Sequence, residues 1–324
     1  MERPLALRCR GLTKSFNGTK AVDALDLSVP ERTIFGLLGP NGSGKTTTIR
    51  IVLGIFARDA GEVTTLGIDD ALAVRDRLGY LPEERGLYPK MKVGEQLAFL
   101  GSIRGLSRRD AKQRAERWLG RLGLAERARS ETNELSKGMQ QKVQFAAAVI
   151  HEPELLVLDE PFTGLDPINT RLLKELILEQ RDRGATVVLS THRMDQVETM
   201  CESICLIHEG RDVLAGPLSE VKAAYGKSSV QLEYDGPPGA LAALEGVREV
   251  RDSGRAASLL LEKGADSQRL LRQLIERVTV RSFVLAEPSV EDIFLDKVGY
   301  VPGLATHPPV APGADVLLAE ESPA

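Results

Sequence analysis

The sequence of 324 residues is poor in cysteine and has no long apolar run. Cys9, Cys201 and Cys205 are too few for a disulfide framework, and Cys201 and Cys205 lack the further ligands that a zinc site needs. We therefore expect buried free thiols. No stretch approaches the roughly 20 apolar residues of a membrane span, and the N-terminal segment has no apolar core long enough for a signal peptide. If the protein acts at a membrane, we expect another chain to cross it.

An excess of positive charge is also missing. The sequence has 42 lysines and arginines against 46 aspartates and glutamates, which gives a formal net charge of −4 and a pI of about 5.8. Domains that bind nucleic acids through general electrostatic attraction are usually basic, so no nucleic-acid partner is expected. With 42% hydrophobic and 27% charged residues, the chain is long enough to bury a full core in one large domain or two.

The hydrophobic pattern of residues 1–218 predicts an α/β domain with a doubly wound core. Residues up to about 30 alternate as an antiparallel β subdomain does, with a turn at Asn17-Gly18. Three continuous apolar runs, "TIFGLLG", "ELLVLDEP" and "ATVVLSTH", are typical of buried parallel strands. Residues 89–150 are mostly helical in pattern and predict a helical subdomain.

The pattern changes after residue 218. Residues 219–300 predict a small α+β accessory domain with the β-α-β-β-α-β order of a ferredoxin-like unit. Its first helix is expected in "ALAALEG", and "SVEDIFLDKVG" is expected to form a closing helix. Residues 301–324 are rich in proline and alanine and are expected to be a disordered tail.

The segment "GPNGSGKTT" matches the phosphate-binding loop G-x-x-x-x-G-K-[ST] and lies between an apolar strand and a helix. Its glycines let the backbone wrap phosphate oxygens, Lys45 is expected to reach the β- and γ-phosphates, and Thr46 to hold Mg²⁺. The alternative, a flexible glycine turn, is disfavoured by the strand-loop-helix context. The residues expected to bind ATP here are Gly39, Pro40, Asn41, Gly42, Ser43, Gly44, Lys45, Thr46 and Thr47.

Polar side chains end the next two apolar strands, at the sheet edge where open α/β sheets bind ligands. Asp159 is expected to orient Mg²⁺ through water, and Glu160 to polarise the attacking water as a general base. His192 closes "VVLSTH", where its imidazole could contact the γ-phosphate. By itself, an acidic pair at the end of a strand is more often a solvated turn, and a single histidine there is usually structural. The presence of the phosphate loop favours functional roles for Asp159, Glu160 and His192.

The segment "LSKGMQQK", Leu135 to Lys142, has the pattern of a helix start without a ligand of its own. Ser136 can cap the helix and Gly138 leaves its first turn bare, so the exposed N–H groups form a ready anion site. No strand precedes this helix and no Lys-Ser/Thr pair follows, as a self-contained phosphate loop requires. In isolation, an ordinary capped helix would be the better interpretation.

Together, over about residues 5–217, these motifs resemble the nucleotide-binding subunit of the ATP-binding cassette (ABC) family, which has a P-loop NTPase fold. "LSKGMQQ" is similar to the family's signature sequence. The segment "GLDP" is similar to its D-loop, which adds Asp166 to the candidate ATP site. The resemblance implies that Ser136 and Gly138 face the ATP held by the Lys45 loop of a second subunit. Phe16 matches the aromatic that stacks on adenine, although a core aromatic of the small sheet has nearly equal weight.

The sequence departs from the usual family pattern at two places. Glu83 in "GYLPEERGLY" stands where the family normally has a glutamine that contacts metal and water, so Glu83 is a candidate Mg²⁺ ligand. In the signature, Lys137 replaces the commoner glycine and Met139 the commoner glutamine. Lys137 could supply positive charge towards phosphate or could equally be solvated. The arginines of "SIRGLSRRDAKQRAERWLGRLG" are interpreted as the solvated face of a helix, with an anionic membrane surface or a permease as the alternative contact.

The resemblance implies an ATPase that powers a membrane transporter and uses ATP and Mg²⁺. The expected partners are an integral membrane permease and a second ATPase subunit, either a copy or a close relative, with two ATP molecules between the subunits. The segment from Tyr88 to Met91 is where the family docks the permease. The motifs look like those of NatA-like exporters, which implies a cytoplasmic location on the inner face of the membrane.

Two alternatives remain open at this stage. A soluble ATPase acting on translation or DNA is disfavoured, because the chain has one phosphate loop and no heptad run before Asp159. The other alternative is a module that binds ATP to dimerise without hydrolysing it, and Glu160 argues against it.

Overall fold

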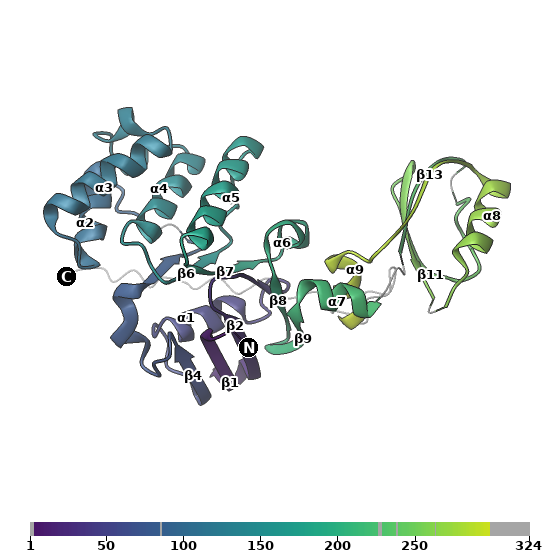
Figure 1. Cartoon of the computed structure of the whole chain (residues 1–324), viewed down its shortest axis with the longest axis horizontal. Coiled ribbons are helices and arrows are strands. Elements are labelled where there is room, and N and C mark those ends of the chain that lie inside the picture. The colour runs from purple at the N-terminus through teal and green to yellow at the C-terminus, as the bar shows by residue number, and fades with distance from the viewer. Residues whose placement is uncertain (1–2, 85, 226–228, 238, 263, 299–324) are drawn as a thin grey trace, which may run out of the picture.

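The computed structural model describes residues 3–84, 86–225, 229–237, 239–262 and 264–298, which form three β-sheets with helices around them. Figure 1 shows two of these sheets and most of the helices gathered in the N-terminal part of the chain, with the third sheet set apart from them. The predicted disordered tail, residues 301–324, lies outside the described residues.

A six-stranded sheet with the order β5-β6-β7-β3-β8-β9 is the largest of the three. Its strands are β3 (Ile34–Leu38), β5 (Leu78–Leu81), β6 (Leu155–Asp159), β7 (Thr186–Thr191), β8 (Ser203–His208) and β9 (Arg211–Pro217). All neighbours pair in parallel except β8 and β9, which pair antiparallel. The three strands predicted from continuous apolar runs are confirmed as β3, β6 and β7, and they are neighbours in the sheet.

Both faces of this sheet are buried, which is why its strands are apolar without alternation. Along β3, Ile34 and Leu38 pack into one core cluster, whereas Phe35 and Leu37 pack into another. The first cluster includes side chains from seven helices, five of which precede β8 in the chain. These five are α2 (Val93–Ile103), α3 (Arg108–Arg121), α4 (Lys137–Val149), α5 (Pro167–Asp182) and α6 (Met194–Met200). Short 3-10 turns at Ala125–Arg127 and Thr132–Glu134 connect α3 to α4.

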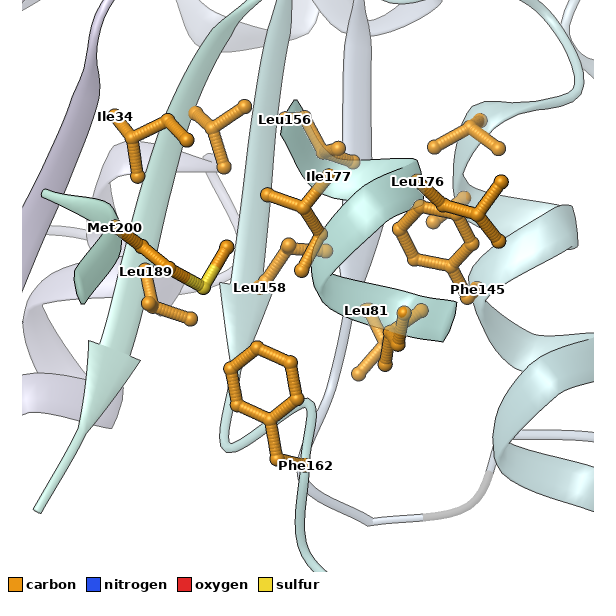
Figure 2. Close-up of a cluster of buried hydrophobic side chains, with 14 of the residues drawn as sticks. Ile34, Leu81, Phe145, Leu156, Leu158, Phe162, Leu176, Ile177, Leu189 and Met200 are labelled. Atoms are coloured by element: carbon orange, nitrogen blue, oxygen red, sulfur yellow. The ribbon is translucent and has the colours of Figure 1, made fainter. Parts of the chain in front are cut away.

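Figure 2 shows part of this first cluster. Ile177 of α5 lies against Leu156 and Leu158 of β6, Leu176 lies farther from that strand, and Phe162 lies just beyond its end. All five side chains are buried. Burial of these side chains holds the carboxyl end of β6 in place.

The second cluster joins the large sheet to helix α1 (Lys45–Val52) and to a three-stranded antiparallel sheet with the order β2-β1-β4. Its strands are β1 (Leu5–Phe16), β2 (Thr19–Pro30) and β4 (Ala60–Thr65). The predicted hairpin is confirmed, because β1 pairs antiparallel with β2 on either side of Asn17-Gly18. A 3-10 helix at Ala71–Arg77 leads from this region into β5.

The third sheet has the order β11-β12-β10-β13 and pairs antiparallel throughout. It consists of β10 (Ser229–Asp235), β11 (Val247–Asp252), β12 (Ala256–Leu261) and β13 (Thr279–Ala286), with α8 (Ser267–Arg277) packed on one face. The first strand of this unit lies between the third and the fourth, as a split β-α-β arrangement requires.

The helix predicted in "ALAALEG" is wrong. Residues 239–245 form turns, and Ala243 has a φ of 53°, in the left-handed region that interrupts a helix. Leu241 and Leu244 are nevertheless buried in the core of the third sheet. The apolar pattern therefore reflects the burial of these leucines and not a helical backbone.

Two helices connect the third sheet to the rest of the chain. They are α7 (Leu218–Tyr225) and α9 (Val290–Val298), and α9 contacts both α6 and α7. Val290 and Ile293 of α9 belong to the first core cluster, and the backbone N–H of Val290 donates to the carboxylate of Glu198 on α6. The predicted closing helix is confirmed, and it packs against the large domain.

The expectation of buried free thiols is confirmed for Cys9, Cys201 and Cys205. Burial raises the pKa of Cys9 and of Cys201 to about 12, so neither thiol ionises near neutral pH. Within the described ranges, no helix combines the length and the apolar character that crossing a membrane would require.

Candidate functional site

The phosphate-binding loop joins the end of β3 to the start of α1, as the sequence motif predicts. Two glycines are required by the fold. A Cβ atom on Gly39 would lie 2.2 Å from the carbonyl oxygen of Ile207, and one on Gly44 would lie 2.4 Å from that of Ala21. Both have positive φ, at 151° and 106°. The loop therefore packs closely on its neighbours while its amides lie at the N-terminus of α1.

Lys45 is buried beneath this loop. Its Nζ donates to the carbonyl oxygens of Gly39, at 2.8 Å, and Pro40, at 2.9 Å. Burial lowers the pKa of Lys45, and the nearby Glu160, Asp159 and Glu83 oppose that shift. The ammonium group is thus held next to the loop and lies near three carboxylates.

Asp159 ends β6 and lies opposite Ser190 in the parallel register with β7. Ser190 Oγ donates to Asp159 Oδ1 at 2.7 Å, and Thr46 Oγ1 donates to Asp159 Oδ2 at 3.0 Å. Burial raises the pKa of Asp159, while the two hydroxyl donors oppose that effect. The candidate metal ligands Thr46 and Asp159 are therefore in direct contact.

Glu160 follows with a backbone φ of 48°, an uncommon conformation for a residue other than glycine. Its N–H donates to the carbonyl oxygen of Ser190 at 2.9 Å. Its carboxylate accepts from Thr191 Oγ1 at 3.1 Å and from the backbone N–H of His192 at 2.9 Å. His192 Nδ1 lies 2.6 Å from the same Glu160 oxygen. The structure thus brings the predicted base and the predicted histidine together.

These residues surround a pocket of about 200 Å³. It is lined by Ala21, Asn41, Gly42, Gly44, Lys45, Thr46, Thr47, Glu83, Asp159 and Glu160. Sites that enclose a drug-sized ligand measure roughly 300–1,000 Å³, so this pocket has room for the phosphates of a nucleotide but not for the whole molecule. Gly39, Pro40, Ser43 and His192 are not among the residues that line it.

The metal-binding side chains predicted from the sequence are oxygen donors, which is the chemistry that Mg²⁺ prefers. Thr46, Glu83 and Asp159 all line the pocket. Across the described residues, no group of three or more His, Cys, Asp or Glu side chains is arranged to hold a metal ion. Mg²⁺ commonly takes one or two carboxylates together with substrate phosphates and water, and the residues present fit that mode.

The signature residues lie elsewhere. Ser136 is exposed and caps α4, where its Oγ accepts from the N–H of Met139 at 3.3 Å. Asp166 caps α5 and accepts from the N–H of Asn169 at 2.8 Å, a bond that lowers the pKa of Asp166. A Cβ on Gly138 would lie 3.5 Å from Leu165, next to the D-loop. Within the described residues, none of Ser136, Gly138 and Asp166 lines the phosphate pocket.

Phe16 is 43% exposed at the end of β1. Its ring meets Phe56 edge to face, with 5.6 Å between the centroids, and Lys14 Nζ lies 5.4 Å from the ring centroid. Phe16 does not belong to the buried part of the second cluster. A ring that remains accessible is available for stacking.

Three polar residues of the site were missed by the sequence analysis. Ser190 and Thr191 hold the two carboxylates, and Gln141 Nε2 of α4 donates to the carbonyl oxygen of Pro161 at 3.0 Å. Ser190 and Thr191 stand directly before His192 in the quoted strand, so placing that strand beside β6 would have revealed them. Gln141 has no such signal, because its partner is a backbone carbonyl.

The chain matches known proteins over both parts of its length. The profile of the family described as "ABC transporter" matches residues 22–163, and that of "ATP-binding protein DrrA1-3-like, C-terminal domain" matches residues 216–298. The chain is 43% identical over 290 residues to the uncharacterized ABC transporter ATP-binding protein YhaQ of Bacillus subtilis, which covers 90% of this chain and 97% of that protein.

Two further similarities agree with these. The chain is 34% identical over 303 residues to the Nod factor export ATP-binding protein I of a Rhizobium species, with 91% of this chain and 97% of that protein covered. A solved structure described as "Structure of ATP binding subunit of ABC transporter" has a TM-score of 0.64 and 31% identity, over 69% of this chain and 94% of that one.

Proposed function

The chain belongs to the ABC transporter family of ATP-binding subunits, which hydrolyse ATP to power a membrane transporter, and we propose that its catalytic site is completed by a second copy of the chain. In this proposal the two copies lie head to tail and hold two ATP molecules between them. Each ATP contacts the Lys45 loop of one copy and the tip of α4, with Ser136 and Gly138, of the other.

One observation carries the proposal. The pocket at Lys45 has room for phosphates alone, and the exposed Ser136 does not line it. The first-turn N–H groups of α4 would supply donors for a phosphate group that a single copy cannot surround. In the proposed dimer, a second copy brings these donors to the open side of the pocket.

The residues around the pocket divide the chemistry between them. Lys45 and the loop amides bind the β- and γ-phosphates, and the accessible ring of Phe16 stacks on the adenine. Glu160 acts as the general base for the attacking water, because three hydrogen bonds from Thr191 and His192 orient its carboxylate. Asp166, at the start of α5, joins the neighbouring copy's site through the D-loop.

Mg²⁺ is proposed as the metal. When bound, it would neutralise charge on the phosphates, with Thr46 and Asp159 as its protein partners and Glu83 as a further oxygen donor. The contact of 3.0 Å between Thr46 Oγ1 and Asp159 Oδ2 supports this assignment, because the two oxygens are close enough to bind the same metal ion.

The permease is proposed to dock near Tyr88, on the cytoplasmic side of a cell membrane. Tyr88 and Phe99 are 53% and 43% exposed, and their rings meet edge to face with centroids 6.2 Å apart. An exposed aromatic pair of this kind is typical of a protein interface. Similarity to a Nod factor export protein and to the DrrA-like C-terminal family supports export as the direction of transport. The same C-terminal match supports a boundary between two domains near residue 218.

Complementation between two inactive variants tests the proposal. Lys45→Ala removes the phosphate contact and Ser136→Arg blocks the tip of α4, so each variant alone should lose ATP hydrolysis. In an equal mixture, half of the dimers are mixed, and one of their two sites combines an intact Lys45 with an intact Ser136. The mixture should therefore recover about a quarter of the wild-type rate of phosphate release.

The control for this experiment is a mixture of Ser136→Arg with the double variant Lys45→Ala, Ser136→Arg, which contains no intact site and should stay inactive. Equilibrium ATP binding should persist in Ser136→Arg and weaken in Lys45→Ala. If the first mixture dimerises and yet stays inactive, the composite site is wrong.

A further inference from the structure

We propose that a second anion site lies between α3 and the end of α5, and that it binds a phosphate-type oxyanion. The site is a pocket of about 140 Å³. It shares no lining residue with the phosphate pocket at Lys45, so it does not depend on the proposed dimer.

Four arginines line this pocket. Arg114, Arg117 and Arg121 project from α3, and Arg183 follows the last residue of α5. They come from segments more than 60 positions apart in sequence, so the fold brings them together. The sequence pattern favoured a solvated helix face for the arginines of α3, and three of them share one pocket in the structure.

The charges around the pocket are not balanced. Glu152, which also lines it, pairs with Arg114 at 3.1 Å, and Glu179 pairs with both Arg121 and Arg183. In the described part of the chain, Arg117 makes no ion pair. Four arginines thus face two carboxylates. The surplus of two positive charges matches a phosphate group, which carries about −1.5 to −2 at neutral pH.

The hydrogen-bonding capacity of the lining points to the same ligand. Arginine side chains only donate, and their fork-shaped guanidinium groups suit the oxygens of phosphate. Gln180 of α5 also lines the pocket and is 3% exposed, and its amide nitrogen has no hydrogen-bond partner among the described residues. A buried donor without a partner is costly, so an acceptor-rich ligand would satisfy it.

The size of the pocket limits what can bind. A volume of about 140 Å³ resembles the cavity of about 150 Å³ that admits one benzene molecule. One phosphate group fits, whereas a whole nucleotide does not. The shared chemistry is therefore a terminal phosphate, either as a free small molecule or as the headgroup of a lipid such as phosphatidic acid.

Trp118 provides the readout for a test. It is the single tryptophan of the sequence, it lines the pocket, and the guanidinium carbon of Arg121 lies 4.7 Å from its ring centroid. Titration of the nucleotide-free protein with potassium phosphate, against potassium chloride at equal ionic strength, should give a saturable change in tryptophan fluorescence that chloride does not produce. Phosphate should also raise the melting temperature, and the rise should grow with the logarithm of the phosphate concentration above the dissociation constant.

Matched variants localise the response. Arg117→Gln and Arg183→Gln should each weaken phosphate binding at least about tenfold. Arg109→Gln removes the same charge from an exposed position of α3 that does not line the pocket, and it should bind as the wild type does. Equal phosphate affinity in Arg117→Gln and Arg109→Gln would overturn the proposal. A chloride response equal to the phosphate response would also overturn it.

Two further arms separate the sources of the phosphate group. Cosedimentation with vesicles containing phosphatidic acid, but not with neutral phosphatidylcholine vesicles, identifies a lipid headgroup if Arg117→Gln abolishes it. Binding of soluble phosphate that Arg117→Gln weakens, without cosedimentation, identifies a free small molecule. If neither soluble phosphate nor phosphatidic acid binds, the site does not exist.

Discussion

His192 Nδ1 lies 2.6 Å from Oε1 of Glu160, and the backbone N–H of His192 donates to the same oxygen at 2.9 Å. The two residues directly follow the neighbouring parallel strands β6 and β7, so the sheet fixes their relative position. An ionised carboxylate only accepts hydrogen bonds, which places the proton of this pair on Nδ1. The candidate base is thus oriented before any nucleotide binds.

Glu160→Gln should retain ATP binding and lose turnover. The amide cannot take a proton from the attacking water, and removing a general base typically costs a factor of about 10² to 10⁴. We expect phosphate release to fall by that factor, while equilibrium ATP binding stays within about threefold of the wild type. Size-exclusion chromatography with ATP should then show accumulated dimers. Phosphate release at the wild-type rate would reject the role of Glu160.

Asp159→Asn should stabilise the nucleotide-free protein at neutral pH while abolishing hydrolysis. Burial raises the pKa of Asp159, so the folded chain binds its proton more readily than the unfolded chain does. At pH values above the pKa of Asp159 in the folded protein, the ionised carboxylate therefore lowers the free energy of unfolding. This destabilisation disappears as the pH falls through that pKa. The asparagine variant carries no such cost at any pH.

The measurement is thermal unfolding in EDTA at several pH values. The melting temperature of Asp159→Asn should exceed that of the wild type at pH 7.5, and the difference should shrink towards pH 4. A variant that is less stable than the wild type at pH 7.5 would show that the hydrogen bonds from Ser190 and Thr46 outweigh the cost of burying the charge.

Local patterns were enough to predict the phosphate loop and the buried strands, because each depends on neighbours in the sequence. Continuous apolar runs identified β3, β6 and β7, and the glycine spacing identified the loop before Lys45. The hairpin of β8 and β9 had a comparable signal that was missed. Glu209 and Gly210 separate its strands and both have positive φ, as a tight hairpin turn requires.

Other features depend on contacts that no local pattern encodes. Ser190 reaches Asp159 because β7 pairs with β6 in one register, and the arginine pocket forms because α3 packs beside the end of α5. In "ALAALEG", by contrast, a local helical pattern was present but did not determine the structure. Its apolar residues follow a helical spacing, but so short a segment gains little from helix formation, and burial of Leu241 and Leu244 determines its path.

Glu83→Gln should change the dependence of hydrolysis on Mg²⁺. Glu83 lines the phosphate pocket together with Asp159 and Glu160, so it adds negative charge beside the triphosphate. Removing that charge should tighten ATP binding in EDTA and raise the Mg²⁺ concentration for half-maximal activity, each by roughly tenfold. Glu84→Gln is the matched control, because Glu84 is exposed and does not line the pocket. Identical Mg²⁺ curves for both variants would remove Glu83 from the site.

Asp292→Asn should loosen the attachment of the third sheet to the rest of the chain. Asp292 is 3% exposed in α9, where its carboxylate accepts from the N–H of Ser289 at 2.9 Å and from the Oγ of Ser289 at 2.7 Å. Its other oxygen pairs with Arg251 Nη1 of β11 at 2.5 Å. Loss of a buried hydrogen bond between charged groups should cost about 2 kcal/mol.

Limited proteolysis of the segment between β13 and α9 measures this loss, since cleavage tracks the population in which α9 has detached. The control is Arg248→Gln, which breaks the neighbouring pair with Asp296, whose side chains are 47% and 30% exposed. Exposed pairs contribute about 1 kcal/mol or less, so this variant should be cut at nearly the wild-type rate. Equal protection of Asp292→Asn and the wild type would mean that the ion pair with Arg251 does not hold the third sheet to α9.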